Sequence, residues 1–455
     1  MIMQDALPGI KRFLGAAKVG DHVMGFLARL MTAFIAHLGR MSASQAAGSV
    51  RTQARHRAAV IRFLAKQQWS GDWSVLEQMA RMVLEADASS KGTWLFIIDQ
   101  TLCGQQGRKT ENTFSTGNRQ RRPRKGRRYQ KYKHARKSCH CFVMGLLLTP
   151  SGLRIPCWRS YYTKEYCEQK KRPYRRQTEL AAELITALVV PEGADVVVLG
   201  DTAFDAECIR AACAPRGFVW IVPVNPERVL AGPKGKRPKV SSLVADFSAS
   251  QFAPVRLTPG QGAFVAHRRV ARCRLGPKVK TRTWYVHEER RAVHSVGEVR
   301  LVFSTKEKPK RGQKVAVQKT LMTNDLRRSL AQVVELYTLR WQIELFFKEL
   351  KSTLGFHQYR FRCFAKVESW VAACLLTFLY LEWYRGVQLR RRQQTAEDKL
   401  WWRWQRSYGL CLAIRQHAEE AELARLAEWT RTPSGVKRLK RQLRAARPLE
   451  YRCAG

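Results

Sequence analysis

Four residues in the last third of the chain have the side-chain types and the spacing to act on phosphate groups. Tyr337, Arg340, Glu344 and Lys351 are separated by three, four and seven positions. On a helix, at about 100° per residue, they would share a stripe roughly 60° wide. The carboxylate could bind a metal ion, and the two cations could contact phosphate oxygens, Arg through its fork and Lys as a point charge.

The neighbouring stripe is apolar, so we expect one amphipathic helix over residues 336–355 whose reactive edge lies beside the core. Its apolar members are Leu336, Leu339, Ile343, Phe346, Phe347, Leu350 and Leu354. A capping box of Ser329 and Gln332 predicts the start of the helix, and Gly355 predicts its end. Glu349 falls far from the reactive stripe, so we expect the substitution Glu349→Gln to cost little.

The simplest alternative is a solvated, salt-bridged helix face, with Glu344 and Lys348 as an i,i+4 pair. A catalytic interpretation requires further carboxylates elsewhere. Two buried runs typical of strands supply them, one ending in Asp99 and the other in Asp201. A lone aspartate at such a place can equally be a turn or cap residue. Asp205 is close to Asp201, but we expect it to be the N-cap that opens the next helix.

The tyrosine, arginine, glutamate and lysine at these fixed gaps resemble the YREK signature of IS4-type DDE transposases. The residues around them, LRWQIELFFKELKSTLGF, also resemble that family. The segment DTAF that begins at Asp201 resembles the family's second-carboxylate motif. The resemblance covers residues 93–385. It implies that Asp99, Asp201 and Glu344 are the catalytic residues of an RNase H-like fold.

Cleaving and rejoining a phosphodiester in line suits two hard cations about 4 Å apart, bound by carboxylates. Mg²⁺ is the expected metal, with Mn²⁺ as a substitute, and the three carboxylates are the expected ligands of both ions. No covalent protein–DNA intermediate is needed. Tyr337, Arg340 and Lys351 are expected to contact DNA. The resemblance implies base stacking by Trp341, for which peripheral packing is the alternative.

The charge balance indicates a polyanionic partner. The 455 residues include 82 Lys and Arg against 36 Asp and Glu, a formal net charge of +46. Nucleic acid is the usual partner of such a chain, and an anionic membrane surface is the alternative. The apolar segment 371–384 includes Glu382 and is too short to span a bilayer. We therefore expect a buried helix there and no membrane association.

A basic run extends from residue 119 to residue 137, with 11 Lys or Arg and no acidic residue. Its composition is typical of a disordered loop in the free protein, and the compatible functional interpretation is an arm that orders on DNA phosphates. The residues expected to bind DNA there are Arg121, Arg122, Arg124, Lys125, Arg127 and Arg128.

The order of elements predicts an α/β fold. Residues 91–224 follow the pattern βββαβαβ of an RNase H-like domain, a mixed sheet flanked by helices. A β-rich insertion of residues 225–322 separates this part from the catalytic helix and the helix after it, within residues 323–385. The candidate strands of the insertion are residues 284–287, 299–304 and 319–323. A helical DNA-binding domain of residues 1–90 and a basic helical domain of residues 386–455 complete the chain.

These features predict a DNA transposase of an insertion sequence, which cuts the terminal inverted repeats of its element and joins them to target DNA. Two alternatives stay open: a catalytically silent, domesticated DNA-binding protein, and a metal-dependent nuclease of the same fold that does not join strands. The expected partners are double-stranded DNA and further copies of the chain, as a homodimer or higher oligomer. Twelve cysteines without a secreted disulfide pattern indicate a reducing compartment. We expect a cytoplasmic, nucleoid-associated protein of a bacterium or archaeon.

Overall fold

The computed structural model describes ten segments of the chain. These are residues 6–17, 19–36, 56–65, 74–85, 92–105, 109–115, 138–232, 238–257, 282–384 and 426–445. The basic run of residues 119–137 and its six expected DNA-binding residues therefore lie outside the described residues. Of the region 386–455, the structure describes residues 426–445, which include helix α17 (Pro433–Ala445).

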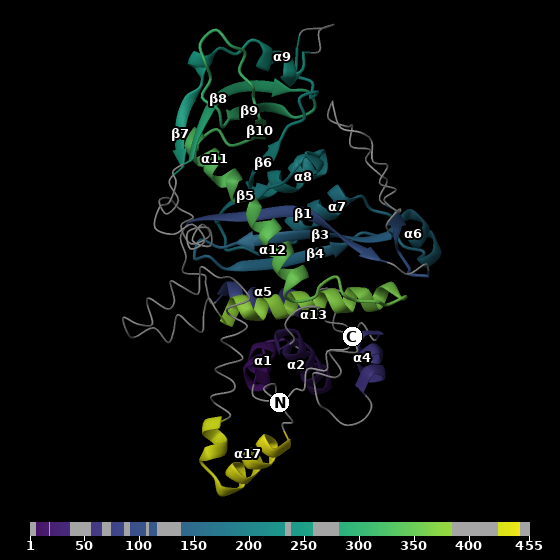
Figure 1. Cartoon of the computed structure of the whole chain (residues 1–455). Helices are drawn as coiled ribbons and strands as arrows, with labels where there is room; N and C mark the ends of the chain where they lie inside the picture. Colours follow the sequence, from purple (N-terminus) through teal and green to yellow (C-terminus); the bar gives the residue numbers. More distant parts are fainter. Residues whose placement is uncertain are drawn as a thin grey trace, which may run out of the picture.

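Five strands form the centre of a ten-stranded mixed sheet (Figure 1). They lie in the order β4 (Arg154–Ser160), β3 (Ser138–Leu148), β1 (Thr93–Gln105), β5 (Asp195–Leu199) and β6 (Val219–Pro223). β1 is antiparallel to β3 and parallel to β5, and β5 is parallel to β6. Most of their residues are buried, which explains their near-continuous apolar sequences. The mixed sheet flanked by helices that the sequence predicted is confirmed.

The insertion continues this sheet instead of forming a separate one. β10 (Lys319–Thr323) pairs antiparallel with β6. β9 (Gly297–Thr305), β8 (Arg282–Val293) and β7 (Ala253–Leu257) follow outward from β10. The three strands predicted for this region fall within β8, β9 and β10. Because β10 returns the chain to the edge of β6, the helices that follow start beside the central strands. The short helix α9 (Val240–Ala245) also belongs to this insertion.

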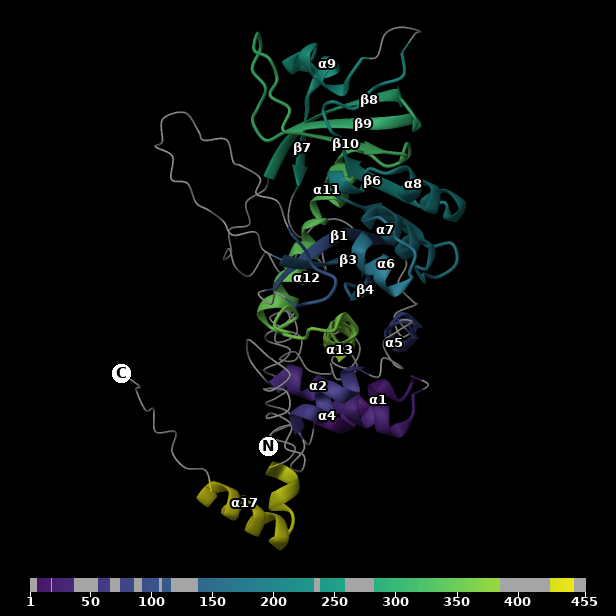
Figure 2. The same cartoon turned by 90° about the vertical axis from the view of Figure 1, so that its right-hand side faces the viewer.

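Helices cover both faces of the central strands. α6 (Lys164–Lys170), α7 (Gln177–Thr186) and α8 (Glu207–Cys213) lie on one side of the sheet, and α11 (Leu330–Thr338) and α12 (Trp341–Ser352) lie on the other (Figure 2). A short strand, β2 (Phe114–Ser115), extends the sheet beside β3.

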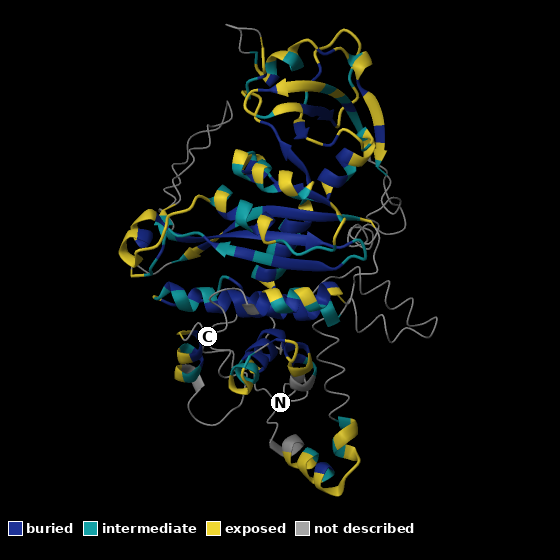
Figure 3. Ribbon diagram, turned by 180° about the vertical axis from the view of Figure 1, so that it is seen from behind, coloured by how far each residue is buried: buried dark blue, intermediate teal, exposed yellow. Residues whose placement is uncertain are grey.

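Helix α13 (Phe364–Trp383) lies between the sheet and three N-terminal helices, α1, α2 and α4 (Figure 2), and Figure 3 shows most of it in the colour of buried residues. The N-terminal helices within the described residues are α1 (Ala6–Leu14), α2 (Asp21–Ala36), α4 (His56–Ala65) and α5 (Ser74–Glu85), of which α5 lies beside α13. Phe34 of α2 meets Trp370 of α13 with ring centroids 4.9 Å apart. By length and composition α13 could cross a membrane, but 83% of its apolar window is buried inside the protein. It is the buried helix that the sequence predicted.

The single helix expected over residues 336–355 is divided into two. α11 ends at Thr338 and α12 begins at Trp341. Between them the N–H groups of Leu339 and Arg340 donate to carbonyls three residues back, at 3.0 and 3.1 Å, which is a 3₁₀ turn. The capping box of Ser329 is confirmed. α12 ends at Ser352, and Gly355 beyond it has a φ of 66°.

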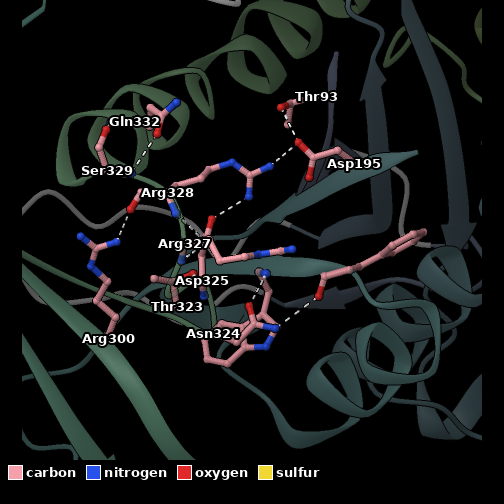
Figure 4. A network of polar contacts seen from close by, with 12 residues as sticks. Thr93, Asp195, Arg300, Thr323, Asn324, Asp325, Arg327, Arg328, Ser329 and Gln332 are labelled. Carbon is pink, nitrogen blue, oxygen red and sulfur yellow. Dashed lines mark hydrogen bonds and ion pairs between the residues drawn. The ribbon is translucent and has the colours of Figure 1, made fainter. Parts of the chain in front are cut away.

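A polar network fixes the entry to α11 (Figure 4). The Arg328 guanidinium pairs with Asp325 at 2.6 Å and with Asp195, the first residue of β5. Asp195 also accepts a hydrogen bond from the hydroxyl of Thr93, the first residue of β1, at 2.6 Å. Arg300 of β9 donates to the carbonyl oxygen of Arg328. The insertion, the start of α11 and the starts of β1 and β5 are therefore held together at one point.

Candidate active site

Asp99 lies in the middle of β1, which continues to Gln105 and does not end at Asp99 as the sequence suggested, and Asp201 follows the end of the neighbouring parallel strand β5. The last paired residues of β1 and β5 are Ile97 and Leu199, and each aspartate follows two positions later. Adjacent strands are about 4.8 Å apart, and equal spacing from the paired residues puts both side chains on the same face of the sheet. Two carboxylates that the sequence placed on separate runs thus meet where the pairing of β1 with β5 stops.

Helix α12 brings Glu344 close to Asp99. Arg340, the residue before α12, donates from Nη2 to Glu344 Oε1 at 2.6 Å. Its Nη1 contacts Asp99 Oδ2 at 3.3 Å. One guanidinium group therefore joins the carboxylate of the helix to the carboxylate of the strand. Asp99, Asp201 and Glu344 are brought together, and their catalytic role is taken up below as a proposal.

Burial and neighbouring charges both change the pKa of Asp99. The pKa of its carboxyl is raised to about 6. Burial is the largest cause, and the negative charges of Asp201 and Glu344 act in the same direction. The backbone N–H of Gln100, which donates to Oδ1 at 2.7 Å, and the charge of Arg340 act in the opposite direction. The site thus carries more negative charge than one arginine compensates.

Asp201 is held by a local turn. Its Oδ1 accepts a hydrogen bond from the backbone N–H of Ala203 at 2.9 Å, so the carboxylate caps the short 3₁₀ helix that follows. Tyr337 is buried, and its hydroxyl points to the carbonyl oxygen of Gly200 at 3.5 Å. Burial raises the pKa of Tyr337 well above its ordinary value. This placement lets Tyr337 brace the Asp201 turn, and its DNA contact stays a prediction.

Asp205, the neighbouring acidic residue, is engaged elsewhere. It pairs with Arg210 at 2.6 Å and with Arg228 at 3.5 Å. The expectation that Asp205 is an N-cap is wrong, because α8 begins at Glu207 and its N-cap is Ala206. The two arginine partners keep the Asp205 carboxylate in a structural ion-pair network.

Lys319 is a site residue that the sequence analysis missed. It is the first residue of β10, and its Nζ lies 4.7 Å from the centre of the Tyr337 ring. Burial lowers the pKa of Lys319 and the charge of Arg340 lowers it further, whereas Glu344 and Asp201 raise it. The insertion thus contributes a cation to the site. Nothing in the sequence distinguishes Lys319 from the other lysines of its basic surroundings.

The two remaining residues expected to bind DNA lie at opposite ends of α12. Trp341 is the first residue of α12 and is 57% exposed, so its ring is open to solvent. Lys351 lies in the last turn and donates from Nζ to the carbonyl oxygen of Leu102 at 3.1 Å. Lys351 therefore also ties α12 to β1.

The expectation that Glu349 is a neutral position is wrong. Its Oε2 accepts from Nη1 of Arg154 at 2.7 Å, and Arg154 also pairs with Glu382 of α13. The side of α12 that carries Glu349 thus makes a partly buried ion pair. Glu298, an exposed residue of β9, is a better neutral reference.

The donor set suits a hard divalent cation, whose preferred ligands are oxygen atoms. In the described part of the chain, no group of three or more His, Cys, Asp or Glu side chains forms a ready metal site. Here Arg340 joins Asp99 to Glu344 and supplies positive charge between them. The pKa of Asp99 is raised mainly by burial and also by the charges of Asp201 and Glu344, so a divalent cation bound there would stabilise its ionised form. The residues therefore fit such an ion.

Comparison with known proteins agrees with this geometry. The family model described as Transposase DDE domain matches residues 90–380, which is more than half of the chain and includes Asp99, Asp201 and Glu344. No curated protein matches the chain. Proteins with this domain are transposases, which bind DNA and typically use divalent metal ions. The chain therefore belongs to the DDE-domain transposase family.

Proposed function

We propose that this chain is the transposase of an IS4-like insertion sequence, which cuts the ends of its element and joins them to target DNA. The observation that carries the proposal is the meeting of Asp99 from β1, Asp201 from the turn after the parallel strand β5, and Glu344 from a helix bound through Arg340. The family match supports the reaction class. The spacing of the YREK residues supports the IS4-like group.

In this proposal Asp99, Asp201 and Glu344 hold two Mg²⁺ ions, or Mn²⁺ as a substitute. When bound, these ions supply activation of the attacking oxygen and stabilisation of the leaving oxygen. Asp99 must be ionised to act as a ligand, and its pKa of about 6 leaves it mostly ionised at neutral pH. The sheet and the anchored helix α12 keep the three ligands at fixed positions, which lowers the cost of assembling the site.

The cations around the carboxylates are proposed to bind the DNA backbone. Arg340 has the fork geometry for a phosphate, and Lys319 and Lys351 act as point charges. Trp341 offers an exposed ring for stacking on a base at the cleaved end. The DNA comprises the element's inverted repeats and the target. The synaptic complex is proposed to contain at least two copies of the chain, in the cytoplasm at the nucleoid.

The test is the substitution Glu344→Gln, with Glu298→Gln as the matched control. The substrate is a linear duplex carrying the element's end with Mg²⁺, plus a pre-cleaved end to isolate joining. We expect Glu344→Gln to lose both cleavage and joining while DNA binding is retained, because phosphate contacts elsewhere dominate affinity. Glu298→Gln should act like the parent.

Each other outcome would assign a different function to this chain. A parent that cuts but never joins would be a nuclease of this fold. A parent that binds the element's end but does neither would be a silent DNA-binding protein. If Glu344→Gln cuts and joins as fast as the parent, Glu344 is not a metal ligand and the assignment of the site is wrong.

A further inference from the structure

A buried ion triad outside the carboxylate site joins α12 to the sheet and to α13. It consists of Arg154 on β4, Glu349 on α12 and Glu382 on α13. Arg154 donates from Nη1 to Glu349 at 2.7 Å, and from Nη2 and Nε to Oε1 of Glu382 at 2.6 and 3.2 Å. The backbone N–H of Arg154 donates to the other oxygen of Glu382 at 3.2 Å. One guanidinium thus connects three elements.

The triad is withdrawn from solvent. The side chain of Arg154 is 7% exposed, that of Glu382 is 0% exposed and that of Glu349 is 19% exposed. A buried ion pair tolerates little displacement, because a shift that separates the partners leaves an uncompensated charge in the interior. The position of α12 at Glu349 is therefore tightly specified.

An aromatic contact fixes the same stretch of α12. The Arg154 guanidinium lies 5.0 Å from the centre of the Phe378 ring on α13. Phe378 in turn meets Phe346 of α12 edge to face, with centroids 4.8 Å apart. Along α12, Phe346 is two residues from Glu344, and Glu349 is five residues from Glu344. The polar and aromatic contacts therefore connect the part of α12 that carries Glu344 to both β4 and α13.

We propose that Arg154 and Glu349 are positioning residues that set the place of Glu344 relative to Asp99 and Asp201, and thereby the affinity of the site for a divalent cation. Glu344 and Glu349 are about 7.5 Å apart along one helix, so a shift or rotation at Glu349 is carried to Glu344. The start of α12 follows a 3₁₀ turn. The C-terminal half of α12 is held in place by the ion pair of Glu349 with Arg154. This inference rests on the proposed metal-binding role of the carboxylates.

The experiment uses the full chain without DNA and compares the parent with Glu349→Gln, Glu349→Asp and the control Glu298→Gln. Mn²⁺ binding is titrated by the resonance signal of the free ion, and amide hydrogen exchange is followed in α12 and, as an internal reference, in α7. Glu349→Gln keeps the size of the side chain but removes its charge. We expect its Mn²⁺ dissociation constant to rise about tenfold and the amides of α12, not those of α7, to exchange faster.

The charge-retaining variant separates positioning from general stability. Glu349→Asp should recover part of the Mn²⁺ affinity, and Glu298→Gln should match the parent. Unchanged Mn²⁺ affinity in Glu349→Gln, with or without faster exchange in α12, would overturn the proposal. A parent that binds no Mn²⁺ would refute the proposed function instead; the exchange data would then decide whether the triad anchors α12, and unchanged exchange would refute that anchoring as well.

Discussion

Arg340 determines the charge balance at the scale of single residues. Its guanidinium contacts Asp99 at 3.3 Å and Glu344 at 2.6 Å, and Lys319 adds a second positive charge nearby. Even so, the pKa of Asp99 is raised, because burial and the two neighbouring carboxylates outweigh the hydrogen bond from Gln100 and the charge of Arg340. A further positive charge at the site would therefore stabilise the ionised form of Asp99. Without that charge, ionised Asp99 destabilises the folded protein.

This instability gives a pH-dependent prediction for Asp99→Asn. The ordinary pKa of 3.8 is raised to about 6 in the folded protein. Between these values the folded state binds more protons than the unfolded state, so this group makes stability fall as pH rises from about 4 to about 6. In EDTA we expect Asp99→Asn to be more stable than the parent by about 1–3 kcal/mol at pH 7.5, with the difference vanishing near pH 4.

The measurement is urea unfolding across this pH range. Asp246→Asn, at an exposed position after α9, is the matched control and should show no such trend. A parent and an Asp99→Asn variant of equal stability at every pH would show that Asp99 is not strained by burial and like charge.

At the scale of elements, the sequence predicted which residues of the segment 336–355 are buried better than it predicted the shape of that segment. The apolar stripe over residues 336–355 is largely buried, as expected. The division at Leu339 and Arg340 was missed because a 3₁₀ turn changes the angle per residue only from about 100° to 120°. Over two residues this hardly disturbs an apolar stripe. The consequence matters, since Arg340 then lies at the joint and reaches both carboxylates.

The two aspartates could be predicted, whereas the triad could not. Asp99 follows the buried run at the start of β1 and Asp201 follows β5, and these strands are parallel neighbours, so local pattern indicated that the two lie close together. The continuation of β1 past Asp99 to Gln105 was missed, because its later residues are not continuously apolar. Arg154 lies 195 residues from Glu349 and 228 from Glu382. No local periodicity connects such residues, and Glu349 judged by helix angle alone looked neutral.

The triad gives a stability prediction for Arg154→Met. Removal of the guanidinium leaves Glu382 buried without its partner, and we expect a loss of about 3–5 kcal/mol in the free energy of unfolding. The double variant Arg154→Met, Glu382→Met removes the stranded charge as well and should recover much of that loss. Equal losses in the single and double variants, measured by urea unfolding, would show that the ion pair itself is not the cause.

At the scale of the whole molecule, one hydrophobic core connects parts that the sequence suggested were separate. The described N-terminal helices and the strands of the insertion share that core with the central sheet. α13 forms the link below the sheet, and β10 forms the link at its edge. A displacement of the insertion would therefore be felt at Lys319 and at the start of α11. The proposed DNA-binding surfaces are thereby attached rigidly to the carboxylate site.

The basic run of residues 119–137 is suited to a clean deletion because of where its described flanks lie. Ser115 and Ser138 are directly paired in the antiparallel ladder of β2 and β3. A two-residue Asn-Gly turn can therefore replace residues 116–137 without straining the sheet. The deletion removes 11 Lys or Arg and no acidic residue.

Each phosphate contact contributes about 0.9 to the slope of log affinity against log salt concentration. We expect the deletion to flatten this slope by several units on element-end duplexes and on unrelated DNA alike, because phosphate contacts carry no sequence information. A variant of full length with these 11 residues changed to Ser and Gln separates charge from loop length and should match the deletion. Fluorescence anisotropy at 50–300 mM salt gives the slopes. An unchanged slope in the deletion variant would mean that the run does not contact phosphate, and that Lys and Arg elsewhere in the chain make the DNA contacts.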